Sequence, residues 1–469
     1  MNRLFVVVLF SMWTTLALSN LETPVLFNIN TSAPVVAENI MINGQAVKIK
    51  DNQIFARTLN TLYPNILYIG DSRQEIEIDA IAPDVIIPIE LRYTDKTIKY
   101  YLNTMPADMP KTSVQNPGNI DGYITTSFHA LTLNEPSYAV ILDTKGNIIY
   151  YMGTDNKQTN IFHLQRWDFT DKTLYSYHIQ TDSPTTGAFL LGDNVVMDDK
   201  FNEIDRVRIL ATERHPEMAA DQHDFVILGD KHYLVISYWY EVPDNATSED
   251  AGFLSAIVQE QKDGQVIFDW VSSDYKKLFD ICIENCPEIK NTTKDYIHIN
   301  SVAVDPADNN LILSLASPHS VIKINRTSGD IIWTLSGLGD DFNVEPEYQL
   351  TRQHDAHIEN GELVIFDNNY STASKIPQIR NKRKEARIAR FKLDETNKQI
   401  LKAVSIPLNI TTPYMGSAQE VSSDRYFVGC GNASTCAAKM QDTDGQNLFI
   451  MTVDKPYTTY RAYFHKDIK

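Results

Sequence analysis

The chain has 469 residues, of which 43% are hydrophobic and 10% aromatic, including 23 Tyr and 19 Phe. This length accommodates one large domain and a smaller one, and the aromatic content favours β structure. A net charge of −18 and a pI near 5.0 argue against nucleic acid or an anionic membrane surface as a partner, because phosphate groups are bound by basic surfaces.

Residues 1–19 have the features of a secretory signal peptide. Arg3 gives a basic start, residues 4–16 form an apolar run, and Ala17 and Ser19 supply the small side chains of an A-x-S cleavage site. A membrane anchor is the alternative, but the run is short and interrupted by polar residues, and no later segment is long and apolar enough to span a bilayer. The sequence therefore predicts a secreted or periplasmic protein without a membrane span.

Residues 20–110 alternate short β runs with turn residues, which predicts a small N-terminal β-sandwich domain. Met105–Gly118 contains three prolines and no hydrophobic periodicity, as expected for a linker. The remainder, residues 111–469, is the predicted catalytic domain.

A recurring unit dominates the rest of the chain: an apolar strand, a polar turn and a second apolar strand. Six copies begin 54 to 67 residues apart, at Val140–Met152, Asn194–Ile209, Ala256–Val271, Val321–Leu335, Ile388–Val404 and Leu448–Phe464. Near-constant spacing with only strands between is typical of radial repetition. We therefore predict an all-β fold with a six-bladed β-propeller over residues 111–469; an irregular sandwich or another blade count is the alternative.

The four cysteines fall into two close pairs, Cys282 with Cys286 and Cys430 with Cys436. Two local disulfides are the simplest interpretation for an exported protein, although cross-pairing remains open. Zinc is a weaker alternative, because neither pair has the C-x2-C spacing. Seven N-x-[ST] sequons would accept glycans in a eukaryotic secretory pathway, at Asn30, Asn245, Asn291, Asn325, Asn369, Asn409 and Asn432.

Three histidines occupy similar phases of successive units. His223 and His354 each lie in a Gln-His-Asp tripeptide, and His298 opens His298-Ile299-Asn300-Ser301. If these positions begin innermost strands, the three imidazoles meet at one mouth of the central channel. Each histidine alone is more often a core or turn residue; together they are compatible with a metal site or with nucleophilic and acid–base catalysis on an anionic substrate.

Segments around these histidines resemble the arylsulfate sulfotransferase family. The stretch Tyr296–Ala303 is similar to its H-x-N-S block, and Arg352–His357 leading to Leu363–Asn368 is similar to its Gln-His block with the strand that ends in Phe-Asp-Asn. Asp221–Asp224 resembles the first histidine block, and the strand after Arg387 follows in the same order. The resemblance covers about residues 120–465, and this family carries a β-sandwich before a six-bladed propeller.

The resemblance implies sulfuryl transfer from an aryl sulfate donor to a phenolic acceptor, without a nucleotide sulfate donor, metal or cofactor. His354 would be the nucleophile and form a sulfohistidine. His223 and His298 would stabilise the sulfuryl oxygens and transfer the proton, with Asn300 in the substrate-binding shell. The partners would be small molecules, with a homodimer left open.

One position departs from the family pattern. The family has an arginine 18 residues after the histidine of the H-x-N-S block, where this chain has Ala316. Arg352 or His319 would have to supply the cation instead. This departure motivates two alternative hypotheses: a catalytically degenerate propeller that binds a sulfated or phenolic ligand, and a histidine-based metal or quinone oxidoreductase.

Overall fold

A computed structural model describes residues 24–28, 40–69, 74–78, 81–83, 85–130, 135–154, 159–181, 190–242, 252–287, 294–371 and 384–468. The predicted signal segment and three sequons, Asn30, Asn245 and Asn291, lie outside the described residues. No helix in the described part of the chain has the length and apolarity that crossing a bilayer requires.

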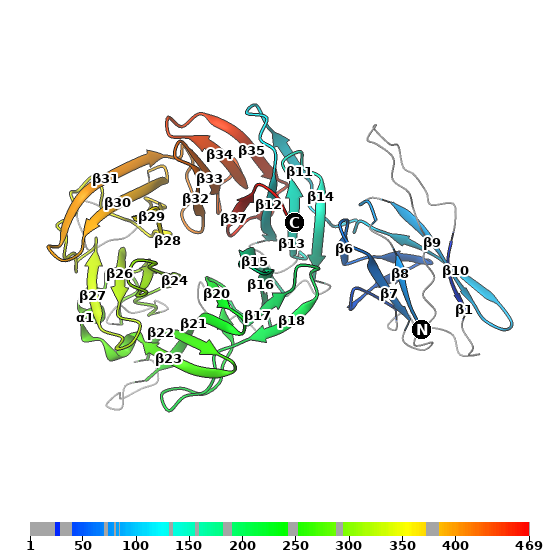
Figure 1. The fold of residues 1–469 in the computed structure, drawn as a ribbon, viewed down its shortest axis with the longest axis horizontal. Coiled ribbons are helices and arrows are strands. Elements are labelled where there is room, and N and C mark those ends of the chain that lie inside the picture. Colours follow the sequence, from blue (N-terminus) through cyan, green and yellow to red (C-terminus); the bar gives the residue numbers. More distant parts are fainter. Residues whose placement is uncertain are drawn as a thin grey trace.

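Two β-sheets form the N-terminal domain, at one side of the molecule in Figure 1. In spatial order, one contains β1 (Val25–Asn28), β9 (Ile86–Arg92), β10 (Thr97–Asn103), β5 (Gln53–Phe55) and β4 (Lys48–Lys50). The other contains β3 (Gln45–Ala46), β2 (Ile40–Ile42), β7 (Asn65–Ile69) and β8 (Gln74–Ile78). Buried and less buried residues alternate along β9, and its buried side chains share one core with those of β2 and β7.

Six further sheets are arranged as blades around a central axis (Figure 1). From the axis outward, blade 2 contains β15 (Ile161–Asp168), β16 (Thr173–Gln180), β17 (Leu191–Met197) and β18 (Glu203–Val207). Blade 3 contains β20 (Phe225–Gly229), β21 (His232–Glu241), β22 (Phe253–Lys262) and β23 (Gln265–Val271). Blade 4 contains β24 (Ile299–Val304), β25 (Leu311–Leu315), β26 (Ser320–Ile324) and β27 (Ile331–Leu335). Blade 5 is β28 (His354–Glu359), β29 (Glu362–Asp367), β30 (Arg387–Asp394) and β31 (Gln399–Pro407). The short β19 (Ala220–Asp221) pairs with β17. A 3-10 turn, η4 (Ser272–Asp274), and the helix α1 (Lys276–Asp280) follow blade 3.

Both ends of the propeller domain close the ring. Blade 1 contains β12 (Tyr123–Ala130), β13 (Tyr138–Asp143), β14 (Ile148–Gly153) and, as its innermost strand, the C-terminal β37 (Ala462–His465), while β36 (Tyr457–Thr458) pairs with the end of β12. Blade 6 contains β32 (Ser417–Ser422), β33 (Arg425–Gly429), β34 (Ala438–Asp442) and β35 (Asn447–Val453), with β11 (Thr112–Gln115) at its outer edge. Backbone hydrogen bonds therefore link the beginning and end of the domain.

The six blade sheets confirm the prediction of a six-bladed propeller (Figure 1). The first five predicted units are the third and fourth strands of blades 1 to 5. The sixth, Leu448–Phe464, is out of phase: it combines the fourth strand of blade 6 with β36 and β37, which belong to blade 1. Middle strands such as β25 and β26 are buried at every position because neighbouring blades cover both faces, whereas the outer β31 is largely exposed.

The N-terminal domain is attached to blade 1. Its strand β6 (Thr58–Asn60) extends that blade by pairing with β14. Arg57 donates to Asp108 at 2.8 Å and to the Tyr138 hydroxyl at 2.6 Å, and the side chains of Arg57 and Tyr138 are buried. The hydrophobic core of the N-terminal domain is continuous with that of blades 1 and 6.

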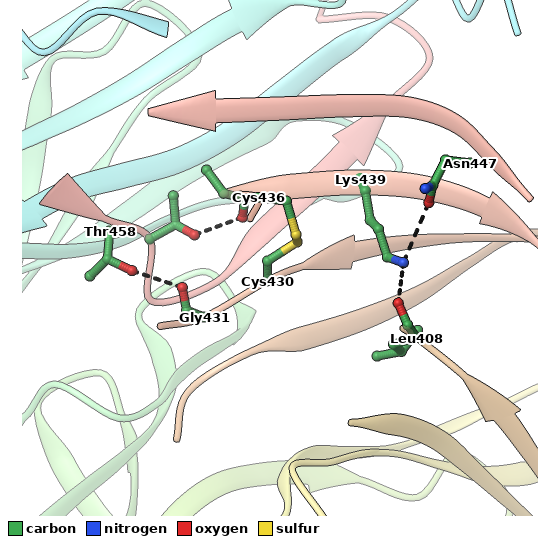
Figure 2. Close-up of a disulfide and its surroundings, with 9 residues drawn as sticks. Leu408, Cys430, Gly431, Cys436, Lys439, Asn447 and Thr458 are labelled. Atoms are coloured by element: carbon green, nitrogen blue, oxygen red, sulfur yellow. Dashed lines mark hydrogen bonds between the residues drawn. A yellow bond between two sulfur atoms is a disulfide. The ribbon is translucent and has the colours of Figure 1, made fainter. Parts of the chain in front are cut away.

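The structure contains the two local disulfides, with Cα–Cα distances of 5.7 Å for Cys282–Cys286 and 5.9 Å for Cys430–Cys436. Figure 2 shows the second one in the turn between β33 and β34. There the Thr458 hydroxyl donates to the Gly431 carbonyl at 2.7 Å, so the turn is fixed against β36. The nearby buried Lys439 donates to the Leu408 carbonyl.

Candidate active site

The three histidines singled out in the sequence begin three successive innermost strands. His223 lies two residues before β20, His298 immediately precedes β24, and His354 is the first residue of β28. The rings of His223 and His298 meet edge to face with centroids 4.8 Å apart, and the charges of both influence the pKa of His354. The structure thus brings the three imidazoles close together at the starts of the innermost strands.

The backbone is irregular where these side chains turn inward. His298 and Asp355 have φ values of 45° and 52°, in the left-handed region that ordinary residues seldom adopt. The register of β24 on β25 shifts between Ile299 and Ser301, and that of β28 on β29 shifts between His354 and His357. Such bulges re-aim side chains next to functional sites, at a local energetic cost of about 1–3 kcal/mol for each strained residue.

The cluster also includes His163, Tyr460 and Arg461, which no local pattern in the sequence marks as site residues. His163, from the innermost strand of blade 2, stacks on Tyr460 at 4.9 Å and donates from Nε2 to the His223 carbonyl at 2.8 Å. The Tyr460 ring also meets the His223 ring edge to face, with centroids 5.8 Å apart. Tyr460 and Arg461 directly precede β37, so their place beside blades 2 and 3 depends on ring closure.

Arg461 is a buried cation balanced by the aspartates of both Gln-His-Asp tripeptides. Its guanidinium lies 3.3 Å from Asp224 and 3.2 Å from Asp355, and it donates to the Asn300 carbonyl at 2.7 Å. Burial raises the pKa of Asp224 to about 6, although Arg461 acts in the opposite direction. A charge held in this way is not available for a substrate.

In each Gln-His-Asp tripeptide, the residues beside the histidine connect blades. Asp224 accepts the Val302 N–H of blade 4 and Asp355 accepts the Ala418 N–H of blade 6, both at 2.9 Å. The Gln353 amide donates to the Ser320 carbonyl of blade 4 at 2.8 Å. Both tripeptides therefore have the same structural role, in which the residues beside the histidine bond to neighbouring blades. The imidazole is the side chain of each tripeptide that we assign to the chemistry.

Carboxylates orient two of the three imidazoles. Nδ1 of His223 lies 2.5 Å from Asp221, and Nδ1 of His298 donates to Asp295 at 2.6 Å. Burial lowers the pKa of His223 well below its usual value and raises that of Asp221 to about 7. Burial also opposes charge on His298, but Asp295 and then Asp221 outweigh it, so its pKa is raised. The pair therefore combines a neutral imidazole with one that favours the protonated form.

His354 has a single tautomer set by its neighbours. Its Nδ1 lies 2.7 Å from Asn368 Oδ1 and 3.0 Å from the Arg352 carbonyl, and both are acceptors, so Nδ1 carries the hydrogen. Nε2 therefore presents its lone pair, which accepts the Met415 N–H at 3.1 Å. Burial lowers the pKa of His354 well below its usual value, which keeps the ring neutral and nucleophilic.

Asn300 and Arg352, the predicted substrate-binding residues, both adjoin the histidines. The fully buried Asn300 donates from Nδ2 to the Gln353 carbonyl at 2.7 Å, and no hydrogen-bond partner for its Oδ1 occurs among the described residues. The Arg352 guanidinium is about one-third exposed and pairs with Glu284, at 2.7 Å for the Nε contact. Ala316 donates its N–H to the His298 carbonyl at 2.9 Å, so the departure from the family pattern lies beside a candidate catalytic residue.

Within the described residues, no group of three or more His, Cys, Asp or Glu side chains is arranged to hold a metal ion. A groove of about 600 Å³ lies between the β2–β7 sheet and blades 1 and 2, where Tyr68, Tyr150 and Phe201 contribute to its wall. None of His223, His298 and His354 lines this groove, so it is separate from the histidine cluster.

The comparison with protein families identifies the chain. The description of the matching family is arylsulfotransferase (ASST), and the match extends over residues 93–463. The chain belongs to the arylsulfotransferase family. This result confirms the resemblance inferred from the histidine blocks, and the match includes all three histidines.

Solved structures similar to this arylsulfotransferase family member have low sequence identities and low TM-scores. A protein of unknown function from Bacteroides caccae is 10% identical, with 73% of this chain and 98% of the other covered and a TM-score of 0.44. A putative 6-phosphogluconolactonase from Bacteroides fragilis is 9% identical over 92% of this chain and 100% of its own, with a TM-score of 0.30. The Dos1 propeller is 11% identical over 62% and 59%, with a TM-score of 0.28. A search of curated proteins finds no match.

Proposed function

We propose that this protein is an aryl-sulfate sulfotransferase that uses His354 as its nucleophile. The supporting observation is the fixed tautomer of His354, in which Asn368 and the Arg352 carbonyl hold the hydrogen on Nδ1. Nε2 then has a lone pair without prior deprotonation. A neutral imidazole in this state can attack sulfur near neutral pH.

In the first half-reaction, Nε2 of His354 attacks the sulfur of the aryl sulfate, the S–O bond to the aryl group breaks, and an N–S bond forms. The departing phenolate takes a proton from His298, whose raised pKa favours the protonated form. In the second half-reaction, the oxygen of an acceptor phenol attacks the same sulfur and returns its proton to His298, and the N–S bond breaks. One site thus serves donor and acceptor in turn.

The remaining polar groups have positioning and charge-stabilising roles in this proposal. His223 faces His298 and, together with Asn300 and Arg352, forms the shell for the sulfuryl oxygens. Protonated His298 and Arg352 supply the positive charge that the alanine at position 316 cannot provide. Sulfuryl transfer, like phosphoryl transfer, depends mainly on such positioning and electrostatic stabilisation.

The test is release of 4-nitrophenol from 4-nitrophenyl sulfate in the presence and absence of a phenol acceptor. We expect phenol-dependent turnover, together with a mass increase of one sulfuryl group on the intact protein when the acceptor is omitted. His354→Ala should abolish both signals. Turnover that persists in His354→Ala would refute the assignment of the nucleophile.

A second candidate function is ligand binding without transfer. Three observations favour it: Ala316 at the arginine position, Glu284 paired with Arg352, and the Met415 N–H bonded to Nε2 of His354. This hypothesis predicts saturable binding of 4-nitrophenyl sulfate, measured by calorimetry, without phenol-dependent release and without labelling of the protein.

A further inference from the structure

A disulfide-closed loop brings a carboxylate to the edge of the histidine cluster. Glu284 lies between Cys282 and Cys286, and its side chain is buried. Its backbone N–H donates to the Ser317 carbonyl at 3.1 Å, and the Ser317 hydroxyl donates to the Asp295 carbonyl at 2.8 Å. The loop is therefore fastened to the segment that orients His298.

The Glu284 carboxylate has polar partners on both oxygens. Oε2 accepts hydrogen bonds from Nε and Nη2 of Arg352, the former at 2.7 Å. Oε1 accepts from the Ser371 hydroxyl at 2.7 Å and lies 3.4 Å from Nε2 of His319. Burial alone would raise the pKa of Glu284, but His319 and Arg352 outweigh it and lower the pKa. The carboxylate is therefore ionised at neutral pH.

Arg352 in turn adjoins the reacting groups. Its carbonyl accepts the Nδ1 hydrogen of His354, and the charge of its side chain acts to lower the pKa of His298. The side chain of Arg352 is 32% exposed, whereas that of Glu284 is 6% exposed. A ligand can therefore reach the Arg352 cation more readily than the Glu284 carboxylate. A sulfate ester that binds Arg352 must share or displace the Glu284 carboxylate.

We propose that Glu284 is a specificity-determining residue, which competes with the anionic sulfate ester for Arg352 and so weakens donor binding. This inference rests on the proposed function, because it assigns Arg352 to the donor subsite. The consequence is that donor binding depends more on contacts with the aryl group, because Glu284 offsets part of the positive charge that Arg352 presents to the sulfate group. Charge-assisted guanidinium pairs are specific in geometry, so a rigid competing carboxylate is effective.

The test compares Glu284→Gln with wild type. Gln keeps the size of the side chain and an oxygen for the Ser371 hydroxyl, but it removes the charge. We expect KM for 4-nitrophenyl sulfate to fall about tenfold with little change in kcat, because the sulfate ester then gains a charge-assisted bond that the carboxylate occupied. The double variant Glu284→Gln/Arg352→Gln should lose this gain.

Ser371→Ala is the matched control, because it removes a hydrogen bond from an uncharged donor to Glu284 and leaves the charges of Glu284 and Arg352 in place. Its KM should stay within about twofold of wild type, as expected when no charged group is lost. An unchanged or higher KM in Glu284→Gln, or an equal fall in Ser371→Ala, would overturn the proposal. If the Gln variant does not fold, Glu284→Asp, which withdraws the carboxylate by one methylene, should lower KM in the same direction.

Calorimetric titration with 4-nitrophenyl sulfate, without acceptor, separates this inference from the proposed function. Tighter binding by Glu284→Gln, combined with no phenol-dependent release of 4-nitrophenol by either protein in the separate turnover assay, would support the role of Glu284 and refute the transferase assignment. Turnover by wild type with equal donor affinity in both proteins would do the reverse.

Discussion

The raised pKa of His298 gives the sharpest prediction about the reaction. Asp295 accepts two hydrogen bonds from this residue, from the backbone N–H at 2.8 Å and from Nδ1 at 2.6 Å. Both side chains are largely buried, at 3% and 15% exposure, so solvent screens their interaction little. Asp295→Asn keeps a side-chain oxygen at this place and removes the charge that outweighs the desolvation of His298.

The variant should lose the proton donor rather than the fold. For a donor whose phenol is a poor leaving group, kcat/KM should fall about 10²–10⁴-fold, the usual contribution of a general acid. For 4-nitrophenyl sulfate, whose phenolate departs readily without protonation, we expect a loss of only about tenfold, from replacing a charge-assisted hydrogen bond by a neutral one.

The pH dependence of activity gives a second test of the role of His298. A general acid works when protonated, so activity declines as the pH rises through the pKa of His298, and that decline should move to lower pH in Asp295→Asn. Asp221→Asn should move the decline in the same direction but by less, because the charge of Asp221 raises the pKa of His298 less than that of Asp295 does. Equal losses for good and poor leaving groups in Asp295→Asn, or a profile that does not move, would refute the role given to His298.

Three further predictions concern the scaffold of the site. Asn368→Ala removes the hydrogen bond to the candidate nucleophile and two hydrogen bonds that Nδ2 of Asn368 donates to carbonyls of the 412–415 loop. We expect kcat to fall about tenfold, measured by donor turnover, and the unfolding free energy to fall by about 2 kcal/mol, measured by urea unfolding. Arg461→Met leaves two buried aspartates without their cation and should cost about 3–5 kcal/mol of unfolding free energy, whereas the same change at the half-exposed Arg425 should cost under about 1 kcal/mol. Burial lowers the pKa of Lys439 from 10.5 to about 8, so between these pH values the unfolded state binds more protons than the folded state. As the pH rises from 7 to 10, the unfolding free energy of wild type should therefore increase by about 3 kcal/mol relative to that of Lys439→Met. Urea unfolding at the two pH values checks this, and a constant difference between the two proteins would contradict it.

The predicted signal segment stays a proposal with a simple test. N-terminal sequencing of exported protein should begin near residue 20, and a mature chain that begins at Met1 would contradict it.

Much of the site could be found from local patterns, because an innermost propeller strand is a short segment with a recognisable phase. His223, His298 and His354 stood at polar positions before apolar strands, and the structure places each at the start of such a strand. The two local disulfides could also be predicted from the sequence, because cysteines four or six residues apart are held close together by the chain itself. The sixth unit was misplaced because strand pairing across the closure leaves no periodic signal in the sequence.

The sequence by itself determined the all-β repeat, the number of blades and the three histidines. Only the tertiary structure decided the environment that gives these imidazoles different protonation states. Tyr460 and Arg461 reach His163 and the two aspartates through a closure strand some 100 to 300 residues away in sequence, and Glu284 meets Arg352 across 68 residues. Desolvation and charge pairing depend on distances in space, and a sequence pattern carries them only when the partners are neighbours along the chain.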